Sequence, residues 1–263
     1  MFRVGFSTLK GLFKDVSVFG LSVAFKALFQ EVGSDNIVLD IPEYGRFTIR
    51  RGDSDYAVIR QTLRDKEYSI HNASISQHLQ LRYKEILSSG RVPVVVDAGA
   101  NIGVSAVWFA KQFEDAEIVA IEPDTENARL AKLNCSGCSR IHVHEAAIGA
   151  VSGYVSVLKG GDSWATQTER ADSGSPIITM SDAVNTVENG ELFIAKIDIE
   201  GFEADLFENN CDWVDSAVAI FIEPHDWLFP GRGTSKTFQS VMGSRGYEIF
   251  ISGENLLYVN FKK

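Results

Sequence analysis

Three ionisable residues alternate in one apolar segment, Leu192–Glu200: they are Lys196, Asp198 and Glu200. Successive side chains of a β-strand point to opposite faces, so the three share one face if the segment is a strand. Burying charge without partners costs several kcal/mol per group, and the pattern therefore needs a reason. Two reasons stay open: an ion pair of Lys196 with an acid, or a catalytic mouth holding a cofactor ammonium, a metal or a substrate hydroxyl. We expect function, because Asp198 and Glu200 stand at the carboxyl end.

A histidine and several acids follow a second apolar run, Ala217–Glu223, in the order Glu223-Pro224-His225-Asp226. The imidazole of His225 can accept a hydroxyl proton near neutral pH, so His225 is a candidate catalytic base, as is Asp198. Asp198, Glu223 and His225 also offer the oxygen and nitrogen ligands that a divalent cation takes. Base, metal ligand and a purely structural histidine all remain open.

A glycine-rich turn ends the first strand of the same region, in the order Asp97-Ala-Gly99-Ala-Asn101-Ile-Gly103. Glycines at such a turn let the backbone bend sharply and approach a ligand closely. The dinucleotide fingerprint G-x-G-x-x-G fails, because counting from Gly99 the third position is Asn101 and the sixth is Val104. The turn therefore favours a ligand with little or no phosphate to place on the helix N-terminus. A tight turn without any ligand is the alternative.

Further acids end the next two strands. Glu122 closes the run Glu117–Glu122, 19 positions after Gly103, where a carboxylate can accept hydrogen bonds from both hydroxyls of a ribose. The following strand ends in Glu145-Ala146-Ala147, which we expect beside an adenine edge. The combination with the glycine turn predicts a nucleoside-binding site.

The elements that must position these residues alternate between strand and helix after Pro93. The predicted strands are Val94–Asp97, Glu117–Glu122, Ile141–Ala147, Gly153–Leu158, Leu192–Glu200, Ala217–Glu223, Tyr247–Ser252 and Leu256–Phe261. The predicted helices are Val104–Phe113, Glu126–Asn134, Met180–Val187, Ala204–Asn209 and Ser235–Arg245. This order predicts an α/β fold with a doubly wound, mostly parallel sheet, whose last two strands form an antiparallel hairpin. Ligands of such sheets bind at the carboxyl ends of the strands.

The N-terminal part has a different pattern. Residues 37–51 alternate as a β-hairpin around Gly45, and residues 55–65 and 74–88 have helical spacing. We therefore expect an N-terminal appendage of helices and a hairpin over residues 1–90, and a cofactor-binding domain over residues 91–263. The Phe-rich residues 1–31 predict helices that pack on the main domain or on a second subunit, giving a homo-oligomer, with a membrane-surface helix as the alternative.

Composition limits the partners. The net charge of −10 makes binding to duplex nucleic acid unfavourable, and no apolar run reaches the roughly 18 residues that span a bilayer. The cysteines Cys135, Cys138 and Cys211 cannot all pair, and we expect inert thiols in a reducing compartment, the cytoplasm, although a redox pair of Cys135 and Cys138 is possible. We also expect no export signal at the N-terminus.

At these motifs the sequence resembles the FkbM family of S-adenosylmethionine-dependent methyltransferases. The resemblance is carried by the glycine turn, by Ile121-Glu122-Pro123-Asp124 and above all by Lys196-Ile-Asp198-Ile-Glu200-Gly201-Phe-Glu203. It implies a seven-stranded class I methyltransferase sheet with the donor in the pocket just described. By this likeness, Gly99 and Gly103 pass the methionine part, Asp97 and Asn101 line it, Glu122 takes the ribose, and Glu145 and Ala147 lie near adenine. It also implies a magnesium ion on Asp198 and Glu223.

The sequence thus predicts a methyltransferase that transfers a methyl group to a hydroxyl of a sugar, a glycan or a natural product. A nicotinamide (NAD(P)-dependent) oxidoreductase and a non-enzymatic nucleoside-binding protein are the alternatives. Two loops, 160–168 with Trp164 and 227–233 with Arg232, are candidate lids over a small-molecule or glycan acceptor.

Overall fold

The computed structural model describes residues 6–28, 36–159 and 166–262, and divides the chain into an N-terminal unit, Met1–Glu67, and a C-terminal unit, Tyr68–Lys263. We predicted the division after residue 90, whereas the structure has it after Glu67. The helix at 73–88 belongs to the C-terminal unit because its Tyr83 is buried there, with ring centroids 5.4 Å from both Phe113 and Phe193. Trp164, proposed above to cover the acceptor, lies outside the described residues.

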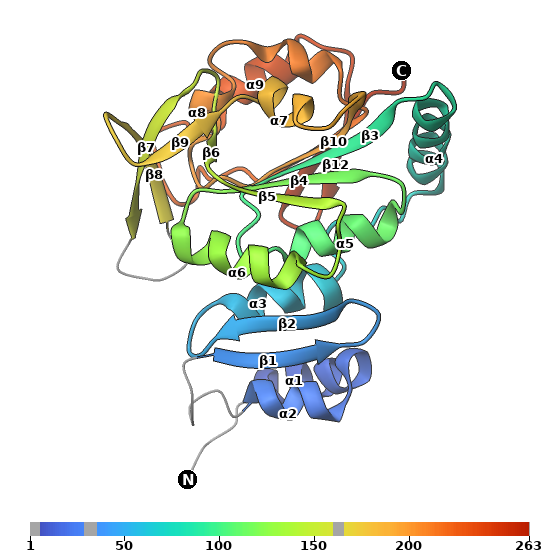
Figure 1. Cartoon of the computed structure of the whole chain (residues 1–263), viewed down its shortest axis with the longest axis vertical. Coiled ribbons are helices and arrows are strands. Elements are labelled where there is room, and N and C mark those ends of the chain that lie inside the picture. The colour runs from blue at the N-terminus through green and yellow to red at the C-terminus, as the bar shows by residue number, and fades with distance from the viewer. Residues whose placement is uncertain (1–5, 29–35, 160–165, 263) are drawn as a thin grey trace. The chain divides into compact units, whose positions relative to one another are not determined.

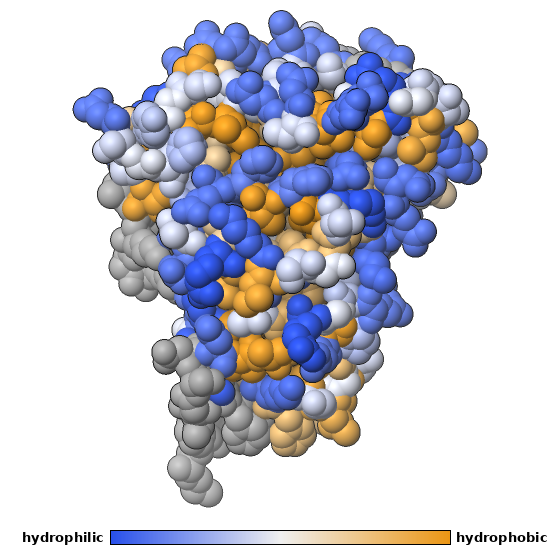
Figure 2. Space-filling view, in the orientation of Figure 1, coloured by the Kyte–Doolittle hydropathy of each residue, from blue (hydrophilic) through white to orange (hydrophobic). Residues whose placement is uncertain are grey.

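The N-terminal unit contains the predicted hairpin and helices. Its elements are α1 (Phe6–Phe19), α2 (Leu21–Leu28), β1 (Asn36–Ile41), β2 (Gly45–Arg50), α3 (Asp55–Ile59) and the π-helix η1 (Arg60–Arg64). Leu39 of β1 and Phe47 and Ile49 of β2 are completely buried, because alternate residues of the hairpin face its helices. Four apolar side chains described in α1 and α2 are exposed, Phe13 at 72%, Leu21 at 62%, Phe25 at 52% and Val18 at 40%. Figure 2 shows apolar surface over these helices. Packing of these helices on the main domain or on a second subunit stays a prediction.

A buried carboxylate holds α1 to η1. Asp15 is 1% exposed and accepts hydrogen bonds from Tyr56 Oη at 3.1 Å, Arg60 Nε at 2.9 Å and Arg64 Nη1 at 2.7 Å. Removing one partner of a buried ion pair leaves the other charge without compensation. We therefore expect Asp15→Asn to lower the free energy of opening of the N-terminal unit by about 3 kcal/mol.

Hydrogen exchange of the α1 and η1 amides in the full chain measures this effect. The exposed pair of Asp40 and Arg46, at 3.1 Å in the same unit, provides the control. Asp40→Asn should change the opening free energy by less than about 1 kcal/mol. Equal effects of the two substitutions would contradict a stabilising role for the Asp15 cluster.

The C-terminal unit is built on a seven-stranded mixed sheet with the order β12-β13-β11-β10-β3-β4-β5. Its strands are β3 (Val92–Ala98), β4 (Glu117–Glu122), β5 (Ile141–Glu145), β10 (Gly190–Ile197), β11 (Ala219–Ile222), β12 (Glu248–Ser252) and β13 (Asn255–Val259). The helical elements are α4 (Ala73–Ser88), α5 (Val104–Gln112), α6 (Thr125–Cys135), α7 (Met180–Asn185), α8 (Glu203–Leu206), the 3-10 helix η2 (Cys211–Asp215) and α9 (Lys236–Gly243). In Figure 1, α5 and α6 lie on one face of the sheet and α7 and α9 on the other.

The predicted α/β fold with a mostly parallel sheet is confirmed, and so is the antiparallel C-terminal hairpin of β12 and β13. The strands are nearly continuous apolar runs because both faces of the sheet are covered, and β11 is buried along its whole length. Among the described residues, no helix is long and apolar enough to cross a membrane.

A second sheet departs from the prediction. It has the order β6-β9-β7-β8, with β6 (Ala147–Ile148), β7 (Gly153–Lys159), β8 (Thr166–Ala171) and β9 (Ser175–Ile178). The predicted strand 141–147 is therefore two strands, and 153–158 does not join the main sheet. Strands β8 and β9 were missed because turn residues surround both and the hydrophobic alternation in them is weak.

Candidate functional site

The register of the parallel strands brings the predicted site residues to one edge. Ala98 pairs with Ile121 and with Ile197, and Ile197 pairs with Ile222. The next residue of each strand is therefore at the same level: Gly99 after β3, Glu122 at the end of β4, Asp198 after β10 and Glu223 after β11. The carboxyl ends thus form one row, as predicted from the sequence.

A pocket of about 560 Å³, open to solvent, lies over part of this row. Its walls come from both sheets and include Gly99, Asn101, Glu122, Pro123, Asn127, Ala147, Ile148, Thr168, Asp198, Glu200 and Phe202. Thr168 belongs to β8, so the unpredicted second sheet supplies one wall of the pocket.

The first turn passes very close to β10. Gly99 has φ +78°, and a Cβ there would lie 1.7 Å from the backbone oxygen of Asp198. Asn101 also has a left-handed backbone, with φ +49°, and its Oδ1 is buried without a hydrogen-bond partner among the described residues. Gly103, with φ +87°, faces α6 instead, where a Cβ would meet Cys135 Sγ at 2.7 Å. Close packing against Asp198 thus requires glycine at position 99, and close packing against α6 requires it at position 103.

Glu122 is a buried carboxyl in the pocket wall, 5% exposed. It accepts hydrogen bonds from the backbone N–H groups of Asn101 at 2.9 Å and Asp124 at 3.0 Å. Burial raises the pKa of Glu122 from 4.5 to about 7, although these hydrogen bonds act in the opposite direction. Oε1 also accepts a longer hydrogen bond from Asn127 Nδ2 at 3.4 Å, whereas Oε2 keeps a second lone pair, with which Glu122 can still accept from a bound hydroxyl.

This pKa makes the stability of the ligand-free protein depend on pH. Because the pKa of Glu122 is raised, its contribution is fully present below pH 4.5 and is lost as pH rises through about 7. The rise of this pKa from 4.5 to about 7 corresponds to about 3 kcal/mol of unfolding free energy. Glu122→Gln stays neutral, so we expect the unfolding free energy of the wild type to fall by about 3 kcal/mol relative to this variant between pH 5 and pH 8. Denaturant titrations at both pH values test this, and a constant difference would contradict it.

The contacts of Lys196 show whether the charged residues at the end of β10 form ion pairs. It is 2% exposed, and its Nζ lies 3.2 Å from Asp97 Oδ1 and 3.4 Å from Asp198 Oδ2. The same Nζ donates a hydrogen bond to the Gly99 carbonyl at 2.7 Å. Lys196 is therefore ion-paired, and through these contacts it fixes both the glycine turn and the acid at the end of β10.

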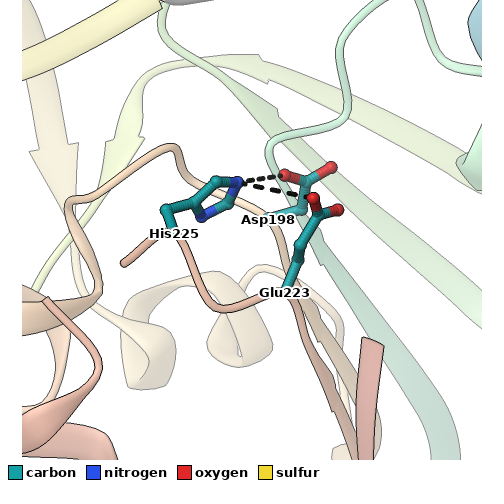
Figure 3. Close-up of side chains that lie close together, drawn as sticks. All are labelled: Asp198, Glu223 and His225. Atoms are coloured by element: carbon teal, nitrogen blue, oxygen red, sulfur yellow. Dashed lines mark ion pairs between the residues drawn. The ribbon is translucent and has the colours of Figure 1, made fainter. Parts of the chain in front are cut away.

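Next to this pair lies a cluster of Asp198, Glu223 and His225 (Figure 3). His225 Nε2 is 3.5 Å from Asp198 Oδ1 and 3.8 Å from Glu223 Oε1. On the other side of the ring, His225 Nδ1 is 2.7 Å from Oε1 of Glu203, which is completely buried. One ligand atom from each of Asp198, Glu223 and His225 lies within 4.8 Å of the others, a spacing that suits a divalent cation.

The acids also change the protonation of the imidazole. Burial lowers the pKa of His225, but the hydrogen bond to Glu203 and the charges of Glu203, Asp198 and Glu223 outweigh it and raise the pKa to about 9. The ligand-free imidazole is therefore positively charged at neutral pH. It can accept a proton only at higher pH, or after a cation placed on Asp198 and Glu223 has displaced its own proton.

The structure gathers some predicted residues at the pocket and leaves others outside it. Gly99, Asn101, Glu122 and Ala147 line the pocket, together with Asp198. The described lining does not include three predicted cofactor residues, Asp97, Gly103 and Glu145. Asp97 is buried beneath the turn, where it accepts a hydrogen bond from Ser105 Oγ at 2.6 Å. Glu145 is half-exposed and ion-paired with Lys132 at 3.1 Å.

Several residues without a predicted role also take part, among them Thr168 and Glu203. Thr168 lines the pocket, and Glu203 binds His225. The final acid of Lys196-Ile-Asp198-Ile-Glu200-Gly201-Phe-Glu203 was a signal for Glu203, because an acid that starts a short buried helix needs a partner. Thr168 is the last residue of the loop 160–168 that we predicted as a lid, and the structure places it in β8.

A match to one known family gives the class of this protein. The family described as the methyltransferase FkbM domain matches residues 97–248, more than half of the chain, and the chain belongs to this family. The resemblance noted in the sequence is thereby confirmed. The family is one of S-adenosylmethionine-dependent methyltransferases, so the pocket is the candidate donor site and the alternative of an oxidoreductase is set aside.

Solved structures that resemble the chain include two bacterial methyltransferases. An O-methyltransferase from Bacillus cereus in complex with SAH is 11% identical, covers 79% of this chain and 91% of its own, and has a TM-score of 0.38. A methyltransferase from Geobacter sulfurreducens is 15% identical, covers 81% and 93%, and has a TM-score of 0.37. No curated protein matches the chain.

Proposed function

We propose that the protein transfers the methyl group of S-adenosylmethionine to a hydroxyl group of a sugar, a glycan or a natural product. One observation supports this most strongly: Asp198 is shared between the pocket wall and the cluster with His225 and Glu223. A donor in the pocket would thus be adjacent to groups that can receive the proton of a hydroxyl. The class I methyltransferase sheet implied by the resemblance agrees with the strand order β5-β4-β3-β10-β11-β13-β12.

The pocket residues fit this donor. Glu122 would accept the ribose hydroxyls, and Ala147 leaves room for the adenine. Asn101 Oδ1, buried and without a partner among the described residues, would accept a hydrogen bond from the donor. Asp97 is engaged by Lys196 and Ser105, so we propose that it acts through the glycine turn rather than by direct contact. Gly103 and Glu145 would likewise act indirectly.

When bound, the donor supplies a methyl group already activated by its sulfonium. The remaining task of the protein is to align the acceptor oxygen with that methyl group and to remove the hydroxyl proton. We propose Oδ1 of Asp198 or Nε2 of His225 as the proton acceptor, since Asp198 lines the pocket and His225 Nε2 lies 3.5 Å from Asp198 Oδ1. A magnesium ion held by Asp198 and Glu223 would supply Lewis acidity that makes the hydroxyl easier to deprotonate.

The remaining partners follow from composition and surface. We propose a small-molecule or glycan acceptor rather than nucleic acid, because the net charge is −10. The exposed apolar side chains of α1 and α2 support a homo-oligomer through the N-terminal unit. The free thiols Cys135, Cys138 and Cys211 support a cytoplasmic location.

Mass spectrometry of the purified protein for bound S-adenosylhomocysteine tests the donor, and an acceptor screen with isotopically labelled donor tests the reaction. We expect hydroxyl compounds to be labelled, with loss of activity after chelation and recovery with magnesium. Labelling of amines or carboxylates alone would contradict methylation of a hydroxyl, and activity that survives exhaustive chelation would remove the metal from the proposal.

A further inference from the structure

A completely buried carboxylate lies just outside the pocket and has no role in the function proposed above. Glu203, the first residue of α8, is 0% exposed, and its Oε1 is 2.7 Å from His225 Nδ1. A carboxylate in this position costs several kcal/mol unless a cation or hydrogen-bond donors compensate it. His225, 3% exposed, supplies such a group.

The same oxygen also contacts the segment that follows β10. Oε1 of Glu203 accepts a hydrogen bond from the backbone N–H of Gly201 at 3.2 Å. Two residues between β10 and α8 have left-handed backbones, with φ +48° at Glu200 and +95° at Gly201. Left-handed conformations of non-glycine residues are held in place by surrounding contacts and cluster at functional sites. Glu203 therefore connects the segment after β10, which lines the donor pocket, to the segment after β11, which carries His225.

The two ring nitrogens of His225 have different neighbours. With Nδ1 hydrogen-bonded to Glu203, Nε2 faces Asp198 Oδ1 at 3.5 Å and Glu223 Oε1 at 3.8 Å. A hydrogen bond at one imidazole nitrogen decides which nitrogen is available for a metal or for proton transfer. Rotating the ring by half a turn would place a carbon against Glu203 and lose this bond.

We infer that Glu203 is a positioning residue: it holds the Nδ1–H of His225 and thereby directs Nε2 toward Asp198 and Glu223. The inference rests on the proposed function, because it explains how the imidazole assigned there to proton transfer or metal binding is oriented. It adds a residue that neither the donor pocket nor the acid cluster includes.

Two substitutions separate the charge of Glu203 from its hydrogen bond. Glu203→Gln keeps the shape and an oxygen that accepts from Nδ1–H, whereas Glu203→Ala removes the acceptor. The readout is the imidazole N–H proton of His225 in proton–nitrogen NMR spectra of the full chain, assigned by its absence in His225→Asn. The exposed pair of His142 Nε2 and Glu117 Oε2, at 2.6 Å, gives the control Glu117→Gln.

We expect the wild type to show a His225 Nδ1–H signal that exchanges slowly with water. In Glu203→Ala this exchange should become at least about 10-fold faster, and in Glu203→Gln the signal should remain but move upfield, because a neutral oxygen accepts a weaker hydrogen bond than a carboxylate. The Glu117→Gln spectrum should keep the wild-type His225 signal. If Glu203→Ala does not fold, the shift in Glu203→Gln decides. An unchanged signal in the folded Glu203 variants would overturn the inference.

Kinetics provide a second readout once an acceptor has been found. Glu203→Ala should lower kcat about 10- to 100-fold with the donor KM unchanged, and Glu203→Gln should restore most of kcat. A rise in donor KM at constant kcat would overturn the positioning role. Calorimetry of the wild type with S-adenosylhomocysteine keeps the two proposals apart: absence of binding there refutes the donor site, while the NMR result still decides the orientation of His225.

Discussion

We expect Gly99→Ala to weaken binding of the methyl donor about 100-fold or more, because of the geometry of the first turn. Gly99 has φ +78°, and a Cβ there would lie 1.7 Å from the backbone oxygen of Asp198. No side-chain rotation relieves a contact with backbone, so either the turn or the end of β10 must move. Both segments line the pocket. We therefore expect the Kd for S-adenosylhomocysteine to rise by a factor of about 100 or more, equivalent to about 3 kcal/mol.

Gly90 provides a matched control in the same unit. Its φ is +77°, nearly that of Gly99, but nothing lies within 4 Å of a Cβ placed there. Gly90→Ala therefore measures the cost of the backbone conformation alone, about 1 kcal/mol of folding stability. Its affinity for S-adenosylhomocysteine should equal that of the wild type. If Gly99→Ala also bound normally, the close approach of the turn to Asp198 would have no bearing on the donor site.

Replacement of His225 should reduce turnover far more than donor affinity. Proton transfer by a positioned side chain contributes about 10²- to 10⁴-fold to rate, and we expect His225→Asn to lose a factor in this range. Asparagine is suitable because its amide nitrogen can take the place of Nδ1 and still donate to buried Glu203. The Kd for S-adenosylhomocysteine should stay within about threefold, since His225 does not belong to the described lining of the pocket.

His142→Asn is the control, because His142 also pairs with a glutamate but at an exposed position on β5. This substitution should leave both turnover and affinity unchanged. Loss of donor binding in His225→Asn with normal turnover at saturation would refute the assignment of His225 to the reaction.

The row of strand ends could be predicted because it depends on local pattern. Continuous apolar runs mark the strands, and parallel register then brings Gly99, Glu122, Asp198 and Glu223 to one level. Which face each side chain uses is harder to read. Glu145 pairs with Glu122 across β4 and β5, as expected for neighbours, yet its side chain binds Lys132 and lies outside the described lining of the pocket.

Other features depend on contacts between distant segments. Glu203 and His225 are 22 positions apart, and only the folded chain shows that they meet. The boundary after Glu67 was missed for a similar reason. Helical spacing alone does not show to which unit α4 belongs, whereas the contacts of Tyr83 with Phe113 and Phe193 in the structure do. The sequence around Lys196 was compatible with either an ion pair or a functional role. In the structure Lys196 forms ion pairs with Asp97 and Asp198, and these hold residues at the pocket in place.

The most direct test of the donor site is a calorimetric titration of the wild-type protein with S-adenosylhomocysteine, repeated with Glu122→Ala. We predict saturable binding at one site per chain, and an affinity at least about tenfold lower in the variant, because the ribose hydroxyls lose their acceptor. Absence of binding to the wild type, or equal affinities of the two proteins, would contradict a donor held between the Gly99 turn and Glu122.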